Sequence, residues 1–316
     1  MSRKRVMMAV AGAAAVWCAA PLAVTRAAQA GPAGAGWGQA IEVPGAGTLN
    51  TGGLAEVVSV SCASAGNCAA GGGYSDGFGN SQAFVASQRN GRWGTAIEVP
   101  GLGPLNLGGL ARVNSVSCAS AGNCTAGGYT TGGSGRGQAF VVSERNGRWG
   151  TATVVPGTQA LNAGGLAQVS SVSCASAGNC TIGGSYGDGF GNVKAFVASQ
   201  RNGRWGKAIK VPGMAALHAV GGASVLSVSC ASAGNCAAGG YYVDRVRHSR
   251  AFLVGQRNGR WGAAIRAPGT DKLNAGHVAE VVSVSCASAG NCTAGGSYHN
   301  RRGLSEAFVT SQRNGR

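Results

Sequence analysis

A run of ten residues, Ser-Val-Ser-Cys-Ala-Ser-Ala-Gly-Asn-Cys, occurs five times in this chain without a single change. Successive copies lie 56 residues apart, and a tryptophan and an Arg-Asn-Gly-Arg segment keep the same interval. A period of this length predicts a repeat architecture in which each unit buries its apolar surface against its neighbours. The units are residues 37–92, 93–148, 149–204, 205–260 and 261–316.

The residues that precede the first repeat have the composition of an export signal. Residues 3–5 are basic, residues 6–24 form an apolar run, and Ala-Gln-Ala follows at 28–30. This order is typical of a secretory signal peptide, and a membrane anchor is the alternative. We expect residues 1–30 to be the signal peptide, residues 31–36 to be a short linker, and the mature protein to be secreted without a membrane span.

The cysteines form regularly spaced pairs. Ten of the eleven lie in five Cys-x5-Cys pairs, and the remaining Cys18 lies in the leader. Even, regular pairs in an exported chain indicate disulfides. A zinc site is less consistent with the spacing, because one pair supplies two of four ligands and no histidine repeats with it. We therefore expect no metal or cofactor, and the disulfides Cys62–Cys68, Cys118–Cys124, Cys174–Cys180, Cys230–Cys236 and Cys286–Cys292.

The alternation of large and small side chains predicts four strands per repeat. For the second repeat, whose first strand begins one residue before the unit, these are residues 92–99, 113–118, 124–129 and 139–145. An Asn-Gly pair then joins the last strand to the tryptophan strand of the next repeat, and this pair favours a type I′ hairpin. Each sheet is therefore shifted relative to the repeat: Val-x-Ser-Val-Ser-Cys is innermost and Arg-Trp-Gly is outermost.

This shifted register predicts an all-β fold, a five-bladed β-propeller with four antiparallel strands per blade. The last repeat ends at its hairpin turn, and the first begins with an extra strand, Trp37–Val43. We expect this N-terminal strand to close the last blade. An open solenoid is the alternative, and it would need polar caps at its ends.

The repeats resemble those of exported actinobacterial proteins with a Ser-Val-Ser-Cys-x5-Cys blade motif. The match comprises Leu49-Asn50, the ten-residue run with the following Ala-Ala-Gly-Gly, Tyr74, Ala-Phe-Val-Ala-Ser-Gln and Arg-Asn-Gly-Arg-Trp, and it covers all five units. The linker before the first cysteine is longer here, and the turn has Arg where the family more often has an uncharged or acidic residue. The resemblance implies an exported propeller and no single activity.

The outer turn also resembles, distantly, the hairpins of Asp-box and kelch-like blades. It lacks the Asp of the sialidase-type Asp-box and is one residue shorter, so we interpret this as shared hairpin geometry rather than shared chemistry.

Residues for catalysis do not recur in the repeats. The inner strands carry no acid, although glycoside hydrolysis normally needs two carboxylates. The four histidines occupy four different repeat positions, and the repeated serines have no repeating His or Asp partner. We expect the protein not to be an enzyme. A propeller hydrolase that uses inner-face residues is a less favoured alternative.

Polar residues recur near the loops that differ between units, and they are the first candidate ligand-binding set. Amides and carboxylates bind hydroxyl groups and aromatic faces stack on sugar rings, whereas Asn and Asp also cap turns. The set is Asn50, Asn106, Asn162 and Asn274, with His218 in the fifth place; Tyr74, Tyr186, Tyr242 and Tyr298; and Asp76, Asp188 and Asp244.

Arginines beside the Asn-Gly turns are the second candidate set, for an anionic ligand. The chain has 26 basic and 10 acidic residues, a net charge of +16, which favours anionic partners. The alternative is that these arginines are only solvated. The set is Arg89, Arg92, Arg145, Arg148, Arg201, Arg204, Arg257 and Arg260, with a non-repeating patch of Arg245, Arg247, Arg301 and Arg302.

From these patterns we expect a secreted, monomeric protein that binds glycans or an anionic cell-envelope polymer through several equivalent sites. A protein-interaction scaffold without a small ligand is the alternative. Nucleic acid is not expected as a partner, because aromatic residues do not alternate with the basic ones.

Overall fold

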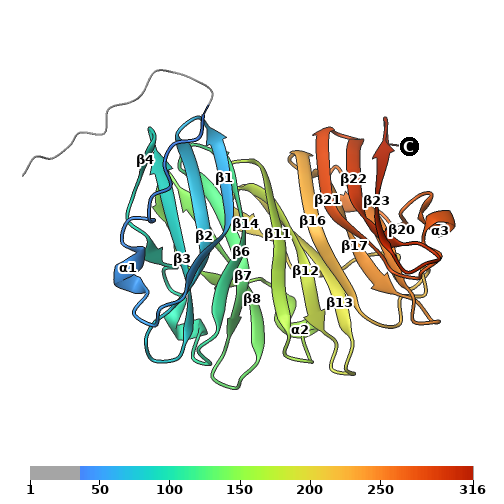
Figure 1. Ribbon diagram of the computed structural model, residues 1–316, viewed down its shortest axis with the longest axis horizontal. Coiled ribbons are helices and arrows are strands. Elements are labelled where there is room, and N and C mark those ends of the chain that lie inside the picture. Colours follow the sequence, from blue (N-terminus) through green and yellow to red (C-terminus); the bar gives the residue numbers. More distant parts are fainter. Residues whose placement is uncertain (1–35, 316) are drawn as a thin grey trace, which may run out of the picture. The chain divides into compact units, whose positions relative to one another are not determined.

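The computed structural model describes residues 36–315, so the predicted signal peptide lies outside the described residues. The chain divides into two compact units, Met1–Ile41 and Glu42–Arg316, and all helices and strands of the described residues belong to the second. These elements form five antiparallel sheets, the five blades of a β-propeller (Figure 1).

Three long strands form the body of each sheet. The inner strands are β1 (Ala55–Ser64), β6 (Ala111–Ser120), β11 (Ala167–Ser176), β16 (Ala223–Ser232) and β21 (Ala279–Ser288). The second strands are β2 (Asn67–Ser75), β7 (Asn123–Thr131), β12 (Asn179–Gly187), β17 (Asn235–Val243) and β22 (Asn291–His299). The third strands are β3 (Ser81–Arg89), β8 (Gly137–Arg145), β13 (Val193–Arg201), β18 (Ser249–Arg257) and β23 (Ser305–Gln312).

The outer strand of sheets one to four is divided into two short pieces. In sheet one, the N–H of Ala96 donates to Pro44 O (2.7 Å), and the middle of the predicted strand therefore leaves β3. The pieces are β4 (Arg92–Trp93) and β5 (Ile97–Glu98), β9 (Arg148–Trp149) and β10 (Thr153–Val154), β14 (Arg204–Trp205) and β15 (Ile209–Lys210), and β19 (Arg260–Trp261) and β20 (Ile265–Arg266).

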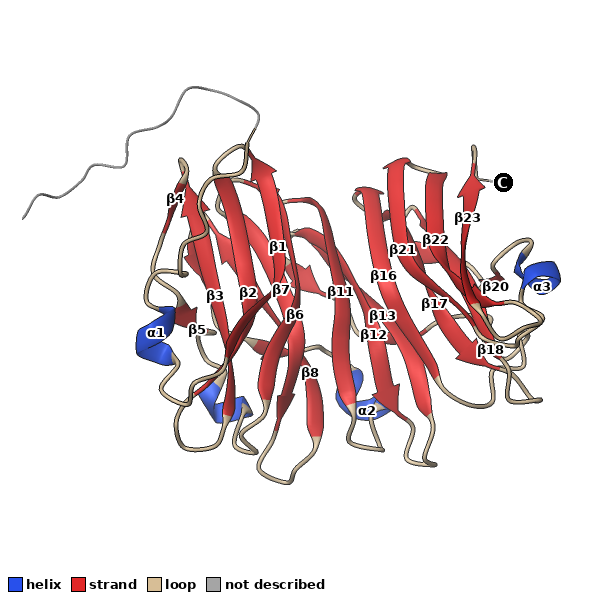
Figure 2. Ribbon diagram, in the orientation of Figure 1, coloured by secondary structure: helices blue, strands red, loops and turns tan. Residues whose placement is uncertain are grey.

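Single helical turns lie in the glycine-rich linkers between sheets (Figure 2). They are too short to leave a helical periodicity in the sequence. They are α1 (Ala46–Leu49), the 3-10 turn η1 (Gly103–Leu105), α2 (Thr158–Leu161) and α3 (Thr270–Leu273).

The predicted strand order, the predicted Asn-Gly hairpin turn and the predicted disulfides are confirmed. Sheet one has the order β1-β2-β3-β4, with β5 also paired to β3. Asn90 and Gly91 have φ angles of 47° and 80°, as a type I′ hairpin requires. All five predicted disulfides are present, with S–S distances of 2.03 to 2.08 Å.

The invariant ten-residue run forms the inner hairpin turn and fastens it to the outer one. In sheet one, Gly66 O accepts a hydrogen bond from the N–H of Gly91 (2.9 Å), and Asn67 Oδ1 accepts one from the N–H of Asn90 (3.4 Å). The same pair of bonds occurs in the other four sheets.

The first two serines of the run join neighbouring sheets. Ser59 Oγ accepts a hydrogen bond from the N–H of Val116 (2.9 Å), and Ser61 Oγ accepts one from the N–H of Cys118 (3.0 Å). Equivalent pairs join sheets two and three, three and four, and four and five. The copies of the run in sheets one to four therefore make the same links to the next sheet.

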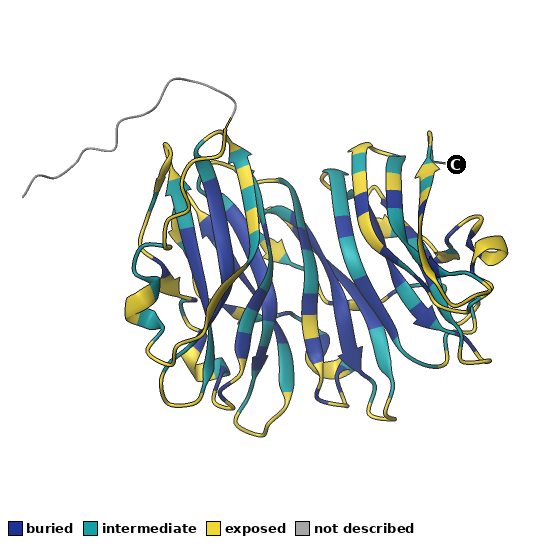
Figure 3. Ribbon diagram, viewed as in Figure 1, coloured by how far each residue is buried: buried dark blue, intermediate teal, exposed yellow. Residues whose placement is uncertain are grey.

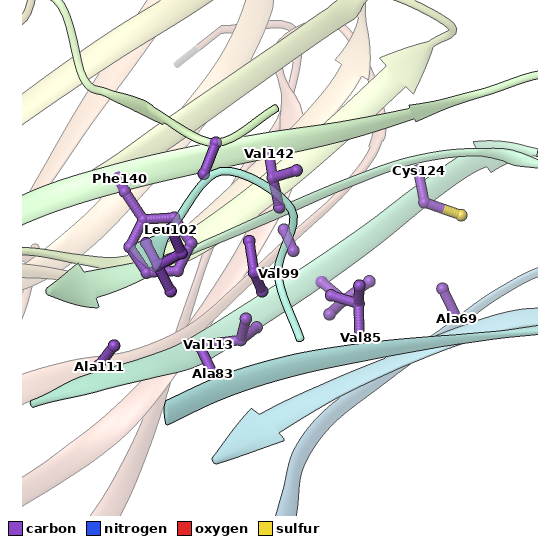
Figure 4. Packing of buried hydrophobic residues seen from close by; sticks show 13 residues of the cluster. Ala69, Ala83, Val85, Val99, Leu102, Ala111, Val113, Cys124, Phe140 and Val142 are labelled. Carbon is purple, nitrogen blue, oxygen red and sulfur yellow. The ribbon is translucent and has the colours of Figure 1, made fainter. Parts of the chain in front are cut away.

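The core lies between the sheets. Between sheets one and two, Val85, Val99, Leu102, Phe140 and Val142 form a cluster with at most 2 % exposure (Figure 4). Burying such side chains stabilises the fold by about 1.5–3 kcal/mol each.

Two faces of the stack are uncovered. Val57 and Val60 of β1 are 43 % and 55 % exposed, whereas their counterparts Val113 and Val116 are 0 % and 5 % exposed. Exposed segments are visible along the first and last sheets (Figure 3). Sheet five has three strands among the described residues, β21-β22-β23. Closure of the ring by Trp37–Val43 is therefore not observed and stays a prediction.

Candidate functional site

Each sheet has two edges with different chemistry. The turn edge carries the Ala-Gly and Asn-Gly turns, for example Gly66 and Gly91 in sheet one. The loop edge carries the helical turns and the loops that differ between units, such as residues 76–80. A strand of nine residues separates the edges by about 30 Å.

The predicted asparagines follow the helical turns at the loop edge and hold the linkers in place. Asn106, Asn162 and Asn274 are 2–7 % exposed. Their Nδ2 atoms donate to backbone carbonyls at the start of the preceding sheet's third strand, as Asn162 does to Gly137 O (2.8 Å). Asn50 is half-buried at the equivalent position, and His218 has a positive φ of 55°. The amides of Asn106 and Asn162 are thus occupied at both ends within the protein, whereas the buried Oδ1 atoms of Asn50 and Asn274 accept no hydrogen bond among the described residues.

The predicted aspartates order the variable loops. Asp76 Oδ1 accepts the N–H groups of Phe78 (2.9 Å) and Asn80 (3.1 Å), and Asp188 and Asp244 make the equivalent bonds. The side-chain hydrogen bond from Asn80 lowers the pKa of Asp76 to about 2. Burial opposes this effect at Asp188 and Asp244, but hydrogen bonds still leave their pKa values lowered.

The four predicted tyrosines are buried beneath the loop edge, at 0–8 % exposure. Their ring faces are therefore covered by protein in this conformation. Burial, followed by the nearby carboxylate Glu98, raises the pKa of Tyr74 to about 12, and burial also raises the pKa of Tyr186 to about 12. The Tyr298 hydroxyl donates to Glu306 Oε2 (2.8 Å), which raises its pKa.

A histidine pair at sheets four and five was not part of the predicted sites. The rings of His248 and His277 stack at 3.7 Å with planes 4° apart, and Arg250 Nη2 donates to His248 Nδ1 (3.1 Å). His277 has a φ of 67°, and the other four units have glycine at its position. That replacement of a repeating glycine is the sequence signal for the pair.

Half of the predicted arginines at the turn edge bridge neighbouring sheets. Arg145 Nη2 donates to Gly203 O (2.9 Å), and Arg201 Nη2 donates to Asn258 O (3.3 Å). Arg89 and Arg257 likewise lie against the next Asn-Gly turn, at Gly147 and Gly315. These four arginines contribute to interblade contacts as well as to surface charge.

The other four turn-edge arginines, which begin the outer strands, are all exposed. No hydrogen bond or ion pair engages their side chains among residues 36–315. They are Arg92, Arg148, Arg204 and Arg260.

The acidic residues are almost all remote from the turn edge. Glu144 alone lies there among residues 42–315, and it is 2 % exposed, accepting a hydrogen bond from Ser87 Oγ (2.8 Å). It stands where Gln88, Gln200 and Gln256 occur in other sheets. The turn edge therefore presents a basic rim to solvent, formed by the eight predicted arginines and by Arg313, which is exposed at the equivalent position of sheet five.

The non-repeating basic patch lies at the opposite edge. Arg245 and Arg247 are in the loop between β17 and β18, Arg301 and Arg302 are in the loop between β22 and β23, and all four are exposed. The structure therefore separates the two predicted anion-binding sets.

Neither a membrane span nor a metal site is found in the described part of the chain. No helix there is long and apolar enough to cross a bilayer, and no group of three or more His, Cys, Asp and Glu side chains is arranged to hold a metal. The five disulfides indicate an oxidising environment.

No family model and no curated protein matches this chain. Solved structures are similar at low identity. A protein of unknown function from Dyadobacter fermentans is 11% identical, with 81% of this chain and 79% of that chain covered and a TM-score of 0.44. An α-L-arabinofuranosidase from Podospora anserina, in complex with cellotriose, is 10% identical, with 84% and 92% covered and a TM-score of 0.36.

The catalytic domain of a GH62 α-L-arabinofuranosidase from Coprinopsis cinerea is 11% identical, with 84% and 93% covered and a TM-score of 0.37. Similarity at this level carries no argument about activity or ligand. The expectation that the chain is not an enzyme therefore stays a prediction.

Proposed function

We propose that this protein binds an anionic polymer, such as an acidic polysaccharide or a phosphate-containing cell-envelope polymer, along the basic rim of the turn edge. The observation that carries the proposal is the repetition of exposed arginines at one edge where the sole acid, among residues 42–315, is buried.

The rim favours an anionic ligand over a neutral sugar. Guanidinium groups form paired hydrogen bonds with carboxylates and phosphates. By contrast, the polar groups expected to bind a neutral glycan are bonded within the protein, as at Asn162 and Asp76, or buried, as at Tyr186.

The repeat makes the rim multivalent. Arg92, Arg148, Arg204 and Arg260 occupy the same position in consecutive sheets, so one flexible chain can contact several of them. Each exposed charge contact contributes only about 0.2–1 kcal/mol. Several contacts to one polymer chain raise the overall affinity, because after the first contact the next ones form at a high effective concentration.

The test compares two variants that each lose four positive charges. The first replaces Arg92, Arg148, Arg204 and Arg260 by Gln, and the second replaces the loop-edge patch of Arg245, Arg247, Arg301 and Arg302 by Gln. Binding of long-chain polyphosphate, polygalacturonate and a neutral glucan is measured at low and physiological salt.

We expect the rim variant to weaken polyanion binding by about tenfold or more, since four contacts of a few tenths of a kcal/mol sum to about 1.4 kcal/mol. The patch variant should bind nearly as wild type, and added salt should weaken wild-type binding. Equal losses in both variants, or no polyanion binding at low salt, would refute the proposal.

A further inference from the structure

A pocket lies between sheets three and four, beside the basic rim and next to the gap in the outer strand of sheet three. Its volume is about 380 Å³, and Gly206 and Lys207, which lie in the gap between β14 and β15, are in its lining. Two outer-strand tryptophans, two rim arginines and an isoleucine also line it: Trp205, Trp261, Arg201, Arg204 and Ile209. The repeat equivalents of these residues line a second pocket, of about 700 Å³, between sheets one and two.

The tryptophans give the pocket between sheets three and four an apolar wall. Trp205 and Trp261 are half-buried, and each packs against one of the two neighbouring hydrophobic cores. Ile209 remains 43 % exposed. Aromatic and aliphatic surface of this kind can bind the C–H face of a sugar ring, whereas a chain of phosphate groups has no apolar face to place against it.

Positively charged side chains surround this wall. Arg201 uses one N–H donor in its bond to Asn258 O (3.3 Å), and a guanidinium has several more. Arg204 and Lys207 are exposed, and no hydrogen bond or ion pair engages their side chains among residues 36–315. Lys207 adds a charge that the other sheets lack, because the equivalent residues of sheets one, two and four are Thr95, Thr151 and Ala263.

A buried amide also lines the pocket. Gln256 is 3 % exposed and donates from Nε2 to Ser199 Oγ (3.0 Å). Its Oε1 atom is buried and accepts no hydrogen bond within the described part of the chain. A buried acceptor without a donor is unfavourable, and a hydroxyl group of a ligand would supply that donor.

The pocket between sheets one and two is less suited to an anion. Glu144 stands where sheet four has Gln256, and its carboxylate accepts a hydrogen bond from Ser87 Oγ (2.8 Å). Arg89 lies 3.9 Å from the same carboxylate, which offsets part of the positive charge there. The residues that line the pocket between sheets three and four include no acid.

We propose that the pocket between sheets three and four binds one uronic acid residue of an acidic polysaccharide. The carboxylate of the sugar pairs with Arg204 and Lys207. The sugar ring lies against Trp205, and one of its hydroxyl groups donates to Gln256 Oε1. This site rests on the polyanion binding proposed for the rim, and it narrows the ligand from anionic polymers in general to polyuronates.

The first experiment compares short ligands by calorimetry at low salt, on the full-length, disulfide-intact protein. We expect trigalacturonate to bind about tenfold or more tightly than tripolyphosphate, because only the uronate has a ring and hydroxyl groups for the pocket. Tripolyphosphate carries at least as much negative charge, so an affinity set by charge alone would follow the opposite order. Maltotriose, which has rings and hydroxyl groups but no charge, should bind far more weakly than trigalacturonate.

The outcomes separate this site from the rim. Tripolyphosphate that binds at least as tightly as trigalacturonate, or long polyanions that bind while trigalacturonate does not, would overturn the pocket and leave binding at the rim standing. Maltotriose that binds as tightly as trigalacturonate would also overturn the uronate site. Failure of every anion to bind, long polymers included, would remove both proposals.

Two substitutions taken from other repeats test the pocket itself. Lys207→Thr introduces the residue of sheets one and two, and it should weaken trigalacturonate binding about threefold. Gln256→Glu introduces the residue of sheet two, and it should weaken binding about tenfold or more, because it adds a negative charge beside the sugar carboxylate. The control Lys210→Thr removes the same charge as Lys207→Thr from β15, outside the pocket lining, and should change the affinity less than about twofold.

Thermal unfolding checks that each variant is folded. Equal losses in Lys207→Thr and Lys210→Thr would show that the pocket adds nothing to general charge and would overturn the proposal. An unchanged affinity of folded Gln256→Glu protein would overturn it as well.

Discussion

Replacing Gly72 by alanine should destabilise the protein strongly, while the same change at the next residue, Gly73, should not. Both glycines lie in β2, so the two variants share the strand, the substitution and the solvent environment. A Cβ added at Gly72 would overlap the backbone carbonyl oxygen of Glu56 in β1, just before the bulge between Val57 and Ser59. At Gly73 the nearest atom is Gln82 O at 3.5 Å, an ordinary contact.

The expected sizes follow from these contacts. A backbone overlap cannot be relieved by a side-chain rotation, so we expect a loss of about 3 kcal/mol or more for Gly72→Ala. Replacing Gly73 by alanine should raise the free energy of unfolding by about 0.5 kcal/mol, because alanine lowers the conformational entropy of the unfolded chain. The other units agree, since they have glycine at the first position and Tyr or Ser at the second.

The assay is thermal and guanidinium unfolding of the disulfide-intact protein, followed by tryptophan fluorescence. At about 2 °C per kcal/mol for a chain of this size, Gly72→Ala should lower Tm by about 6 °C or more. If the unfolding free energy of Gly72→Ala is within about 1 kcal/mol of that of Gly73→Ala, the Glu56 carbonyl does not require glycine at position 72.

Three further predictions concern titration and cross-linking. Tyr74 and Tyr186 should ionise near pH 12 in an absorbance titration of the folded protein and near pH 10 in the unfolded protein. Because the pKa is higher in the folded state, the contribution of these tyrosines to stability is lost as pH rises from about 10 to 12. Asp76 has the lower pKa in the folded state, so its contribution is complete above about pH 4 and lost as pH falls toward 2, and Asp76→Asn should reduce the acid dependence of unfolding. Replacing both Cys118 and Cys124 by alanine should lower the free energy of unfolding by about 2 kcal/mol, and an unchanged value would show that this disulfide does not constrain the unfolded chain.

The strands, turns and disulfides were predictable because their signals are local. Asn90-Gly91 specifies its turn through positive φ at two adjacent residues, and Cys62 and Cys68 face each other across that sheet's inner hairpin. The break in the outer strand was not predictable, since it depends on Ala96 donating to Pro44 in a linker 52 positions earlier in the sequence.

The roles of the polar candidates were also set by tertiary contacts. The sequence alone shows that Asn162 can cap a turn. It does not show the hydrogen bond from Asn162 to Gly137 O, because that bond forms only when the two sheets are packed. The stacked rings of His248 and His277 come from two different repeats. Comparison of the repeats shows that each histidine is unusual at its position, but it does not show that the two are in contact.

The serine links between sheets have a consequence for copy number. Ser59 and Ser61 present the acceptors, and Val116 and Cys118 present the donors, so every sheet has one acceptor side and one donor side with the same chemistry. Gain or loss of one whole 56-residue unit would leave the serine links at every remaining junction unchanged. The serine links therefore set no limit on the number of units, and a variant of this chain that is one unit longer or shorter should form the same pair of links at each of its junctions.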